Sequence, residues 1–236
     1  MISRVLRLAV AALVLVLVGA SAAADGRRMI AAHEQNEWRA VGRLNLGDAF
    51  CTGALVAPDL VATAAHCLFA PRTGVARRAD RIHFVAGYRL RRHSGHRRAS
   101  ALTVHPEYSH ARRLDAQAVG SDLALVRLAA PFDDVPPFSL APGLSPGDEV
   151  AIVSYGRDRP EAPSIQSPCR ATARFGAIAV LACDVTHGVS GAPVFRRVDG
   201  EWRIVAVVSS MGDYLGEPHA FAVALDASLG AVLSVP

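Results

Sequence analysis

The feature that most constrains this chain is a series of short apolar segments, each bounded by Gly, Pro, Asp or Ser. Each has about five to nine residues, the usual length of a β-strand and too short for a typical helix. The segments are residues 40–46, 51–57, 82–87, 101–105, 123–128, 149–155, 177–183, 193–198, 202–210 and 220–225. Because no long helical period separates them, we predict an all-β protein, a sandwich or a barrel. Residues 226–233 are expected to form a short terminal helix.

A proline-rich stretch divides the chain near its middle. Residues 130–148 contain five prolines, which break any regular element there. The chain has 236 residues, enough for one domain or for two compact halves. We therefore expect two β halves, residues 25–135 and 136–236.

The N-terminal stretch has the layout of a secretory signal peptide. Arg4 and Arg7 precede an apolar run at 8–20, and the small residues of SAAAD follow. The run is shorter than the roughly 20 apolar residues that a spanning helix needs, which argues against an uncleaved anchor. We predict a signal peptide at 1–24, no membrane span after it, and export to the periplasm or the medium.

Four cysteines become interpretable if the protein is exported. An oxidising compartment favours disulfides, and four cysteines allow three pairings. The two local closures, Cys51 with Cys67 and Cys169 with Cys183, each span a loop of about 15 residues, worth about 3 kcal/mol in the chain-entropy model. A zinc site is the alternative, but no C-x-x-C pair is present and no histidines stand at ligand spacing.

All 25 basic residues are arginines, and the net charge is +4. The densest cluster, Arg89 to Arg98, is either an anion-binding patch or a solvated surface loop. No aromatic residues interleave with these arginines for base stacking, so we expect no nucleic-acid binding.

Three stretches carry side chains suited to catalysis. His66 follows an apolar strand in LVATAAHCLFA, where small neighbours would let another segment approach its ring; a core histidine is the alternative. Asp122 precedes the apolar segment 123–128 and would lie at the mouth of a strand, or else cap a turn. Ser190 lies in GVSGAPVF, which is either a nucleophile loop or a flexible surface loop.

The glycines beside Ser190 favour the catalytic interpretation. Gly188 and Gly191 permit backbone conformations that side chains forbid. The N–H groups of Gly188 and Ser190 can then point at one place and form an oxyanion hole. Ser190 would be the nucleophile, His66 its base and Asp122 the carboxylate that orients the base. Along the chain they come in the order His, Asp, Ser, which differs from the orders in subtilisin and the α/β-hydrolases.

These motifs resemble those of the trypsin/chymotrypsin-like serine endopeptidases. TAAHC is nearly a signature of that family, and SDLALVRL and GVSGAPVF are similar to its Asp strand and its Ser loop. CTGALVAPDLVATAAHC is similar to its first disulfide loop, and IVAVVSS to the strand that pairs with substrate. The resemblance runs from about Trp38 to the C-terminus. The pattern CDVTHGVSG is nearer to bacterial secreted members, including glutamyl endopeptidase-like ones.

The resemblance implies two six-stranded antiparallel β-barrels with the active site in the cleft between them. It implies a secreted serine endopeptidase working through an acyl-enzyme, with His66 and Asp122 from the first barrel and Ser190 from the second. Protein or peptide substrates and no metal or cofactor follow from it, and we expect a monomer. Each disulfide, Cys51–Cys67 and Cys169–Cys183, would tether a catalytic loop.

Two other functions are considered beside this one. The first is a catalytically silent homologue that binds proteins through the same cleft, against which the complete triad argues. The second is an esterase or lipase with the same triad. The chain order and the lack of a G-x-S-x-G elbow argue against it.

Side-chain preference is left open by the motifs. Asp184 lies six residues before Ser190, where trypsins keep the carboxylate that selects Arg or Lys. Glutamyl endopeptidase-like relatives can carry the same Cys-Asp pair, and a hydrogen-bonded loop aspartate is an equal alternative. His187 would lie at the substrate entrance, where an exposed non-catalytic side chain is the favoured role, and Ser209 is placed in the pocket.

Val189 raises a question about how the serine loop is ordered. In trypsins the residue before the nucleophile is an aspartate, and a newly cleaved N-terminal amine pairs with it. Valine cannot accept that hydrogen bond, and a buried ammonium without a partner is strongly unfavourable. Although Arg27 and Arg28 offer a dibasic site just before Met29, we do not expect activation through such an ion pair.

Overall fold

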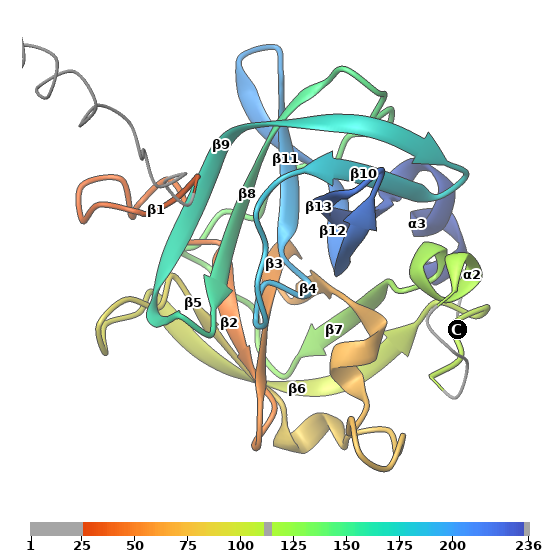
Figure 1. Ribbon diagram of the computed structural model, residues 1–236. Helices are drawn as coiled ribbons and strands as arrows, with labels where there is room; N and C mark the ends of the chain where they lie inside the picture. The colour runs from red at the N-terminus through yellow and green to blue at the C-terminus, as the bar shows by residue number, and fades with distance from the viewer. Residues whose placement is uncertain (1–25, 111–114, 234–236) are drawn as a thin grey trace, which may run out of the picture.

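The computed structural model describes residues 26–110 and 115–233 (Figure 1). The predicted signal peptide, 1–24, lies outside the described residues. In the described part of the chain, no helix is both long enough and apolar enough to cross a bilayer. The strands are β1 (Arg27–Met29), β2 (Val41–Asn45), β3 (Phe50–Ala57), β4 (Leu60–Thr63), β5 (His83–Ala86), β6 (Gly95–Val104), β7 (Ala124–Leu128), β8 (Glu149–Gly156), β9 (Arg159–Phe175), β10 (Ile178–Ala182), β11 (Pro193–Val198), β12 (Glu201–Tyr214) and β13 (Glu217–Ala224).

The helices are few and short. Two 3₁₀ turns, η1 (Ala65–Leu68) and η2 (Ala79–Arg81), lie in the first half of the chain. The helix α2 (Ala116–Gly120) leads into β7, and α3 (Leu225–Leu233) follows β13. The short terminal helix expected at 226–233 is thereby confirmed. With so little helix, the apolar segments pair as strands and bury their side chains inside the resulting sheets, as the sequence predicts.

The first half of the chain closes into a barrel of antiparallel strands in the order β2-β3-β4-β7-β6-β5 (Figure 1, orange to green). Alternate side chains of these strands point inward, and Leu44, Leu55, Phe84 and Val126 are fully buried in its core. Because these described strands close on themselves, the barrel presents no free sheet edge.

The second half forms another barrel, in the order β9-β10-β13-β12-β11-β8, closed by the pairing of β8 with β9 (Figure 1, green to blue). Strand β1 adds a seventh strand on β9, with Arg28 opposite Ile165. The fold is therefore all-β with two closed six-stranded antiparallel barrels, as the resemblance implied.

The two barrels share an apolar core. Trp38 packs against Phe195 with ring centroids 5.2 Å apart, and Phe138 lies 4.6 Å from the same ring. Aromatic pairs of this kind contribute about 0.5–1.5 kcal/mol beyond the area that they bury. Side chains of β3, β4 and β7 join the same cluster as those of β8, β11 and β12. This shared core fixes the barrels against each other, and the pocket described below lies between them.

The proline-rich connection runs from 129 to 148, between β7 and β8. Phe138 N donates to Leu55 O in the first barrel, and Ala141 N donates to Ile204 O in the second. The connection is thus hydrogen-bonded to both barrels. The predicted division at 135/136 falls within it and stays a prediction.

Three elements differ from the expectations. Strand β9, 17 residues long, did not stand out as an apolar segment, and neither did β1. The second part of the Arg89–Arg98 cluster belongs to β6, so the loop interpretation of those residues is wrong. There the Arg97 guanidinium lies 4.5 Å from the centroid of the Phe132 ring.

Both disulfides of the structure close local loops. Cys51 on β3 is bonded to Cys67 on η1, and Cys169 on β9 is bonded to Cys183, just after β10. The first links the strand β3 to the turn that carries His66. The second links two neighbouring strands near the start of the segment that leads to Ser190.

Candidate active site

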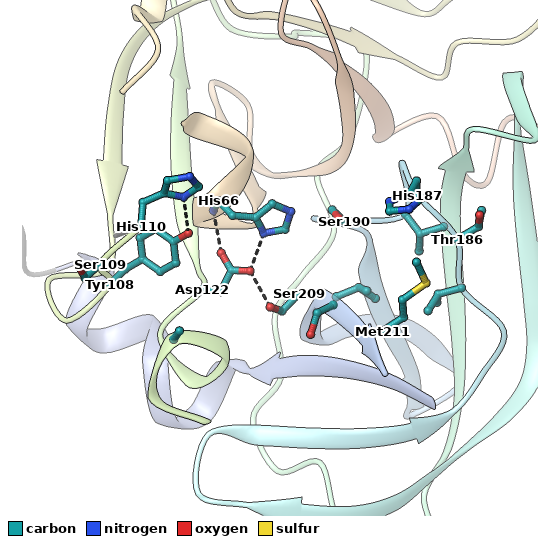
Figure 2. A pocket seen from close by; sticks show the side chains of 15 residues that line it. His66, Tyr108, Ser109, His110, Asp122, Thr186, His187, Ser190, Ser209 and Met211 are labelled. Atoms are coloured by element: carbon teal, nitrogen blue, oxygen red, sulfur yellow. Dashed lines mark hydrogen bonds and ion pairs between the residues drawn. The ribbon is translucent and has the colours of Figure 1, made fainter. Parts of the chain in front are cut away.

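His66 and Asp122 lie together at one end of the first barrel (Figure 2). His66 is on η1, directly after β4, and Asp122 lies between α2 and β7. Asp122 Oδ1 accepts from the backbone N–H of His66 at 2.8 Å, and Oδ2 lies 2.7 Å from His66 Nδ1. Only 3% of Asp122 is exposed. The two contacts fix both the ring and the backbone of His66 on a buried carboxylate.

Ser209 supplies a further donor from the second barrel. Its hydroxyl on β12 donates to Asp122 Oδ2 at 2.6 Å, and Ser209 is itself buried (Figure 2). Short hydrogen bonds to a carboxylate stabilise its charged form. From the sequence, Ser209 is predicted only as a residue of the substrate pocket, without this contact. A serine within the apolar strand segment IVAVVSS needs a partner when buried, and that requirement was the available signal.

The pKa of His66 is set by opposing effects. Burial lowers it, but the charge of Asp122 and the hydrogen bond to Nδ1 outweigh the burial and leave the pKa above its ordinary value. With Nδ1–H bonded to the carboxylate, the neutral ring presents Nε2 as its proton acceptor. The pair is thus arranged to take a proton at Nε2 and to stabilise the resulting imidazolium.

Ser190 faces the same pocket from the second barrel. The pocket is lined by His66, Asp122 and Ser190, with Val208 and Ser209 of β12 among its other walls. Within the described residues no hydrogen bond joins Ser190 Oγ to His66; the contact recorded for Nε2 is with Cys67 Sγ, at 3.8 Å. Such bonds are often long before substrate binds. The structure therefore brings all three predicted residues to one pocket.

The turn around Ser190 depends on its glycines. Gly188 has φ +95° and Gly191 has φ +77°, both in the left-handed region that favours glycine. Among the hydrogen bonds of the described residues, none uses the N–H of Gly188 or of Ser190. Both donors are thus available for an oxygen that enters the pocket.

The residues predicted for substrate selection do not all lie in one place. His187 and Ser209 line the pocket that contains Ser190. Asp184 is exposed and lines a neighbouring pocket together with Asp213 and His219. Val185 and Met211 line both pockets.

The alternative of a zinc site meets a chemical obstacle. Ligand atoms of Cys51, His66 and Cys67 lie within 4.8 Å of one another. Both sulfurs are bonded to each other, however, so neither is the thiolate that zinc binds. The disulfide instead holds the backbone beside His66.

Two closed antiparallel barrels, with a His–Asp pair and a serine turn facing one pocket, define the class of chymotrypsin-like serine proteases. The chain belongs to the trypsin family, whose model matches residues 29–228. Among solved structures it is similar to a Glu endopeptidase in complex with MPD. The TM-score is 0.75 and the identity 19%, with 89% of this chain and 95% of that chain covered. The family resemblance inferred from the motifs is confirmed, and the chain is a serine endopeptidase acting on proteins or peptides.

Proposed function

We propose that Ser190, His66 and Asp122 form the catalytic triad and that the reaction passes through an acyl-enzyme. The observation that carries this proposal is the buried Asp122 carboxylate, which holds His66 Nδ1 at 2.7 Å while His66 and Ser190 line one pocket. A serine hydroxyl is a weak nucleophile at neutral pH, so a base must take its proton. His66 Nε2 is available for that role.

Each step then has a group to perform it. Ser190 Oγ attacks the scissile carbonyl as its proton moves to His66 Nε2, and Asp122 stabilises the imidazolium. The N–H groups of Gly188 and Ser190 bind the oxyanion; losing one such donor typically costs about 10²–10³ in rate. His66 donates its proton to the leaving amine, and water attacks the ester with His66 as base. The acid leaves and the Ser190 hydroxyl is restored.

We propose that the side chain of substrate that enters beside Ser190 is apolar. Val185, Val208 and Met211 line this pocket, while Asp184 faces the neighbouring one. Asp122 is a carboxylate in the pocket, but it is already bonded to His66 and Ser209. Digestion of a peptide library by the wild type and by Asp184→Ala tests this directly. Unchanged cleavage after apolar residues in both supports the proposal, and an Asp184-dependent preference for Arg contradicts it.

The remaining proposals concern the whole chain. We propose a signal peptide at 1–24, two domains at 25–135 and 136–236, and an exported monomer in the periplasm or the medium. Two disulfides support an oxidising compartment. N-terminal sequencing of the protein recovered outside the cytoplasm tests the cleavage site.

A fluorophosphonate probe tests the catalytic proposal, because it reacts with an activated serine. We expect wild type to be labelled at Ser190 and Ser190→Ala to be unlabelled and still folded. The peptidase rate of Ser190→Ala should fall by at least about 10⁴. A folded wild type that resists the probe and cleaves no peptide is instead a silent homologue.

A further inference from the structure

Val189 leaves the serine loop without the charged partner that orders it in trypsins. Its side chain is 1% exposed and packs in the apolar cluster that includes Val194, Val205 and Val208. The loop must therefore be ordered by contacts that involve no ion pair at this position. The carbonyl groups of the loop identify these contacts.

Four successive peptide groups from His187 to Gly191 each have their carbonyl bonded. His187 O accepts from Arg157 N at 2.7 Å, and Val189 O accepts from Ala192 N at 2.9 Å. Because a trans peptide is planar, these two bonds also set the directions of the N–H groups of Gly188 and Ser190. The other two carbonyls, of Gly188 and Ser190, are both bonded by a single residue.

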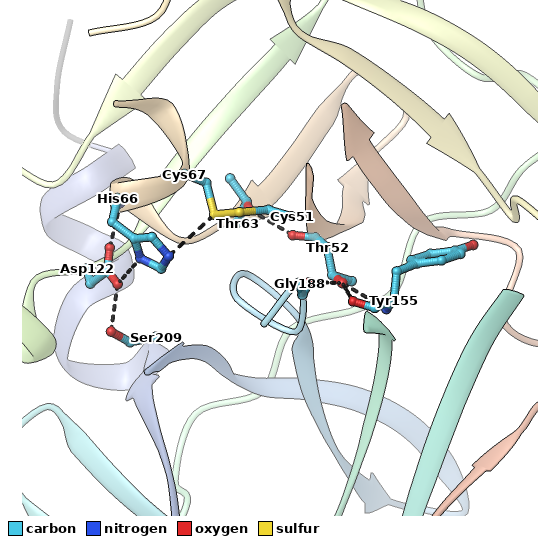
Figure 3. Close-up of a disulfide and its surroundings, with 9 residues drawn as sticks. All are labelled: Cys51, Thr52, Thr63, His66, Cys67, Asp122, Tyr155, Gly188 and Ser209. Atoms are coloured by element: carbon cyan, nitrogen blue, oxygen red, sulfur yellow. Dashed lines mark hydrogen bonds and ion pairs between the residues drawn. A yellow bond between two sulfur atoms is a disulfide. The ribbon is translucent and has the colours of Figure 1, made fainter. Parts of the chain in front are cut away.

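One residue of the first barrel holds both of these carbonyls. Thr52 on β3 donates its N–H to Ser190 O at 2.9 Å. Its hydroxyl donates to Gly188 O at 3.0 Å (Figure 3). The same hydroxyl accepts from Tyr155 N at 3.0 Å. A hydroxyl has one proton to donate and can accept as well, so this arrangement satisfies it. Thr52 Oγ1 thus joins the strand β8 of the second barrel to the loop from His187 to Gly191, here called the oxyanion loop.

The surroundings of Thr52 leave it little freedom. It is fully buried, and its own carbonyl accepts from Thr63 Oγ1 at 2.8 Å. A Cβ at Gly191 would overlap both Thr63 Oγ1 and Thr52 O, so only glycine lets the loop approach this closely. Cys51, its neighbour, is bonded to Cys67 beside His66.

The region around Met29 is engaged elsewhere. Arg27–Met29 pair with β9 as β1, and Ile30 is fully buried with its N–H donating to Pro163 O at 2.9 Å. Arg28 forms an ion pair with Glu34 at 2.6 Å. The described contacts of this region are with the second barrel, with Glu34 and with Arg89 of the first barrel, and they need no free amine.

We propose that Thr52 is a positioning residue for the oxyanion hole, its buried hydroxyl holding the Gly188–Val189 peptide from the opposite barrel. The inference rests on the proposed function of Ser190 and names what orders its loop in place of an ion pair. Thr52 touches no substrate; it acts through Gly188.

The test compares two pairs of proteins, wild type with Thr52→Val and Thr52→Ser with Thr52→Ala, and in each pair only the first has a hydroxyl at position 52. Thr52→Val keeps the shape of threonine without the hydroxyl, and Thr52→Ala differs from Thr52→Ser by the hydroxyl only. Thr172→Val is the matched control, because it removes a threonine hydroxyl that bonds Val180 O and does not line the pocket of Ser190. For each variant kcat, KM, thermal unfolding and inhibition by a peptidyl trifluoromethyl ketone are measured. That ketone forms an oxyanion with the serine, whereas the matched peptide amide does not.

We expect Thr52→Val and Thr52→Ala to lower kcat by about 10- to 100-fold, less than the loss of an oxyanion donor itself. KM and the affinity of the peptide amide should change by no more than about twofold, since ground-state contacts remain. Affinity for the ketone should fall in parallel with kcat. Thr52→Ser should recover most of the wild-type rate, and Thr172→Val should keep it. If Thr52→Val fails to fold, the Ala/Ser pair carries the comparison.

Two results would overturn the inference. One is wild-type kcat and ketone affinity in a folded Thr52→Val. If Thr52→Val does not fold, the same result in a folded Thr52→Ala counts equally. The other is a Thr52→Ser as impaired as Thr52→Ala, which would indicate packing alone. Absence of turnover in the wild type would instead contradict the proposed function.

Discussion

The two sides of the pocket are held by different kinds of contact. On the first barrel, a buried carboxylate fixes His66, and a disulfide one residue further on fixes its backbone. On the second barrel, the loop of Ser190 is held by hydrogen bonds to its carbonyls and by glycines at positive φ. One side depends on charge and a covalent bond, the other on the direction of peptide groups. The two sides should therefore respond differently to the same kinds of change.

The largest effect is expected from removing the charge on the first side. Asp122→Asn should lower kcat by about 10⁴, because the amide no longer fixes the right His66 tautomer or stabilises the imidazolium. The fluorophosphonate reaction rate should fall with it. The affinity for the trifluoromethyl ketone, compared with the remaining kcat, reports separately on the loop of Ser190. We expect that loop to be intact. A rate within tenfold of wild type would mean that the carboxylate does not serve the histidine.

The second prediction concerns pH. Because Asp122 raises the pKa of His66, the acid limb of kcat/KM should lie above the ordinary histidine pKa of 6.5. The raised pKa of His66 affects folding stability in the opposite direction to activity as pH increases. A folded-state pKa above the unfolded one stabilises the fold fully below the unfolded pKa, and this contribution is lost as pH rises through the folded pKa. Activity should rise over the same range in which that contribution disappears.

Rate profiles and unfolding free energies measured from pH 5 to pH 9 check both signs. The natural control is Asp122→Asn, in which the limb of the remaining activity should move to lower pH. An acid limb that stays in place when the carboxylate is removed would assign the titration to another group.

The disulfides allow a direct comparison of the two sides. Replacing either cysteine pair by alanines should destabilise the protein by about 3 kcal/mol. The two effects should be similar, since the paired cysteines are 16 and 14 positions apart and close loops of similar length. Only loss of Cys51–Cys67 should also lower kcat, by at least about tenfold, because its ends adjoin Thr52 and His66. Without Cys169–Cys183, β10 keeps its pairing with β9 and β13, so kcat should stay within about threefold.

Urea unfolding and steady-state kinetics on the two double variants separate stability from rate. Peptide mapping without reduction checks the pairing first. A peptide joining Cys67 to Cys169 would contradict the connectivity. Equal losses of kcat in both variants would show that the two bridges do not differ in their relation to the site.

The smallest effect is expected at the N-terminal segment. Proteins beginning at Asp25 and at Met29, the latter with its amine free or acetylated, should have activities within about twofold of one another. Stability should fall slightly from Asp25 to Met29, because two residues of β1 are lost. A large gain at Met29 that acetylation removes would show that an amine orders the loop after all.

The sequence predicts the fold better than it predicts the contacts within the site. Strands such as β3 and β10 are short apolar runs between turn residues, so their pattern identifies them. Strand β9 carries Pro160, Pro163 and Pro168, which indicate turns when read locally. Its pairing with β8, β10 and β1 outweighs that local signal.

The site itself divides in the same way. That His66, Asp122 and Ser190 meet at one pocket can be predicted, because each lies in a short motif with its own composition. The contacts of Ser209 with Asp122 and of Thr52 with Gly188 join residues 87 and 136 positions apart. No local pattern encodes such pairs, because they depend on how the two barrels meet. Asp184 shows the same limit, since its position in the motif does not indicate which pocket its side chain faces.

The long-range contacts of Thr52 also bear on when the protein becomes active during its own synthesis. The oxyanion loop needs Thr52 from near the start of the chain and Val208, whose carbonyl accepts from Gly191 N, from near its end. Contacts of such sequence separation form late in folding, after the local hairpins. An incomplete or half-folded chain therefore carries the serine but no ordered site around it. We therefore expect such a chain to be inactive until its two barrels have docked.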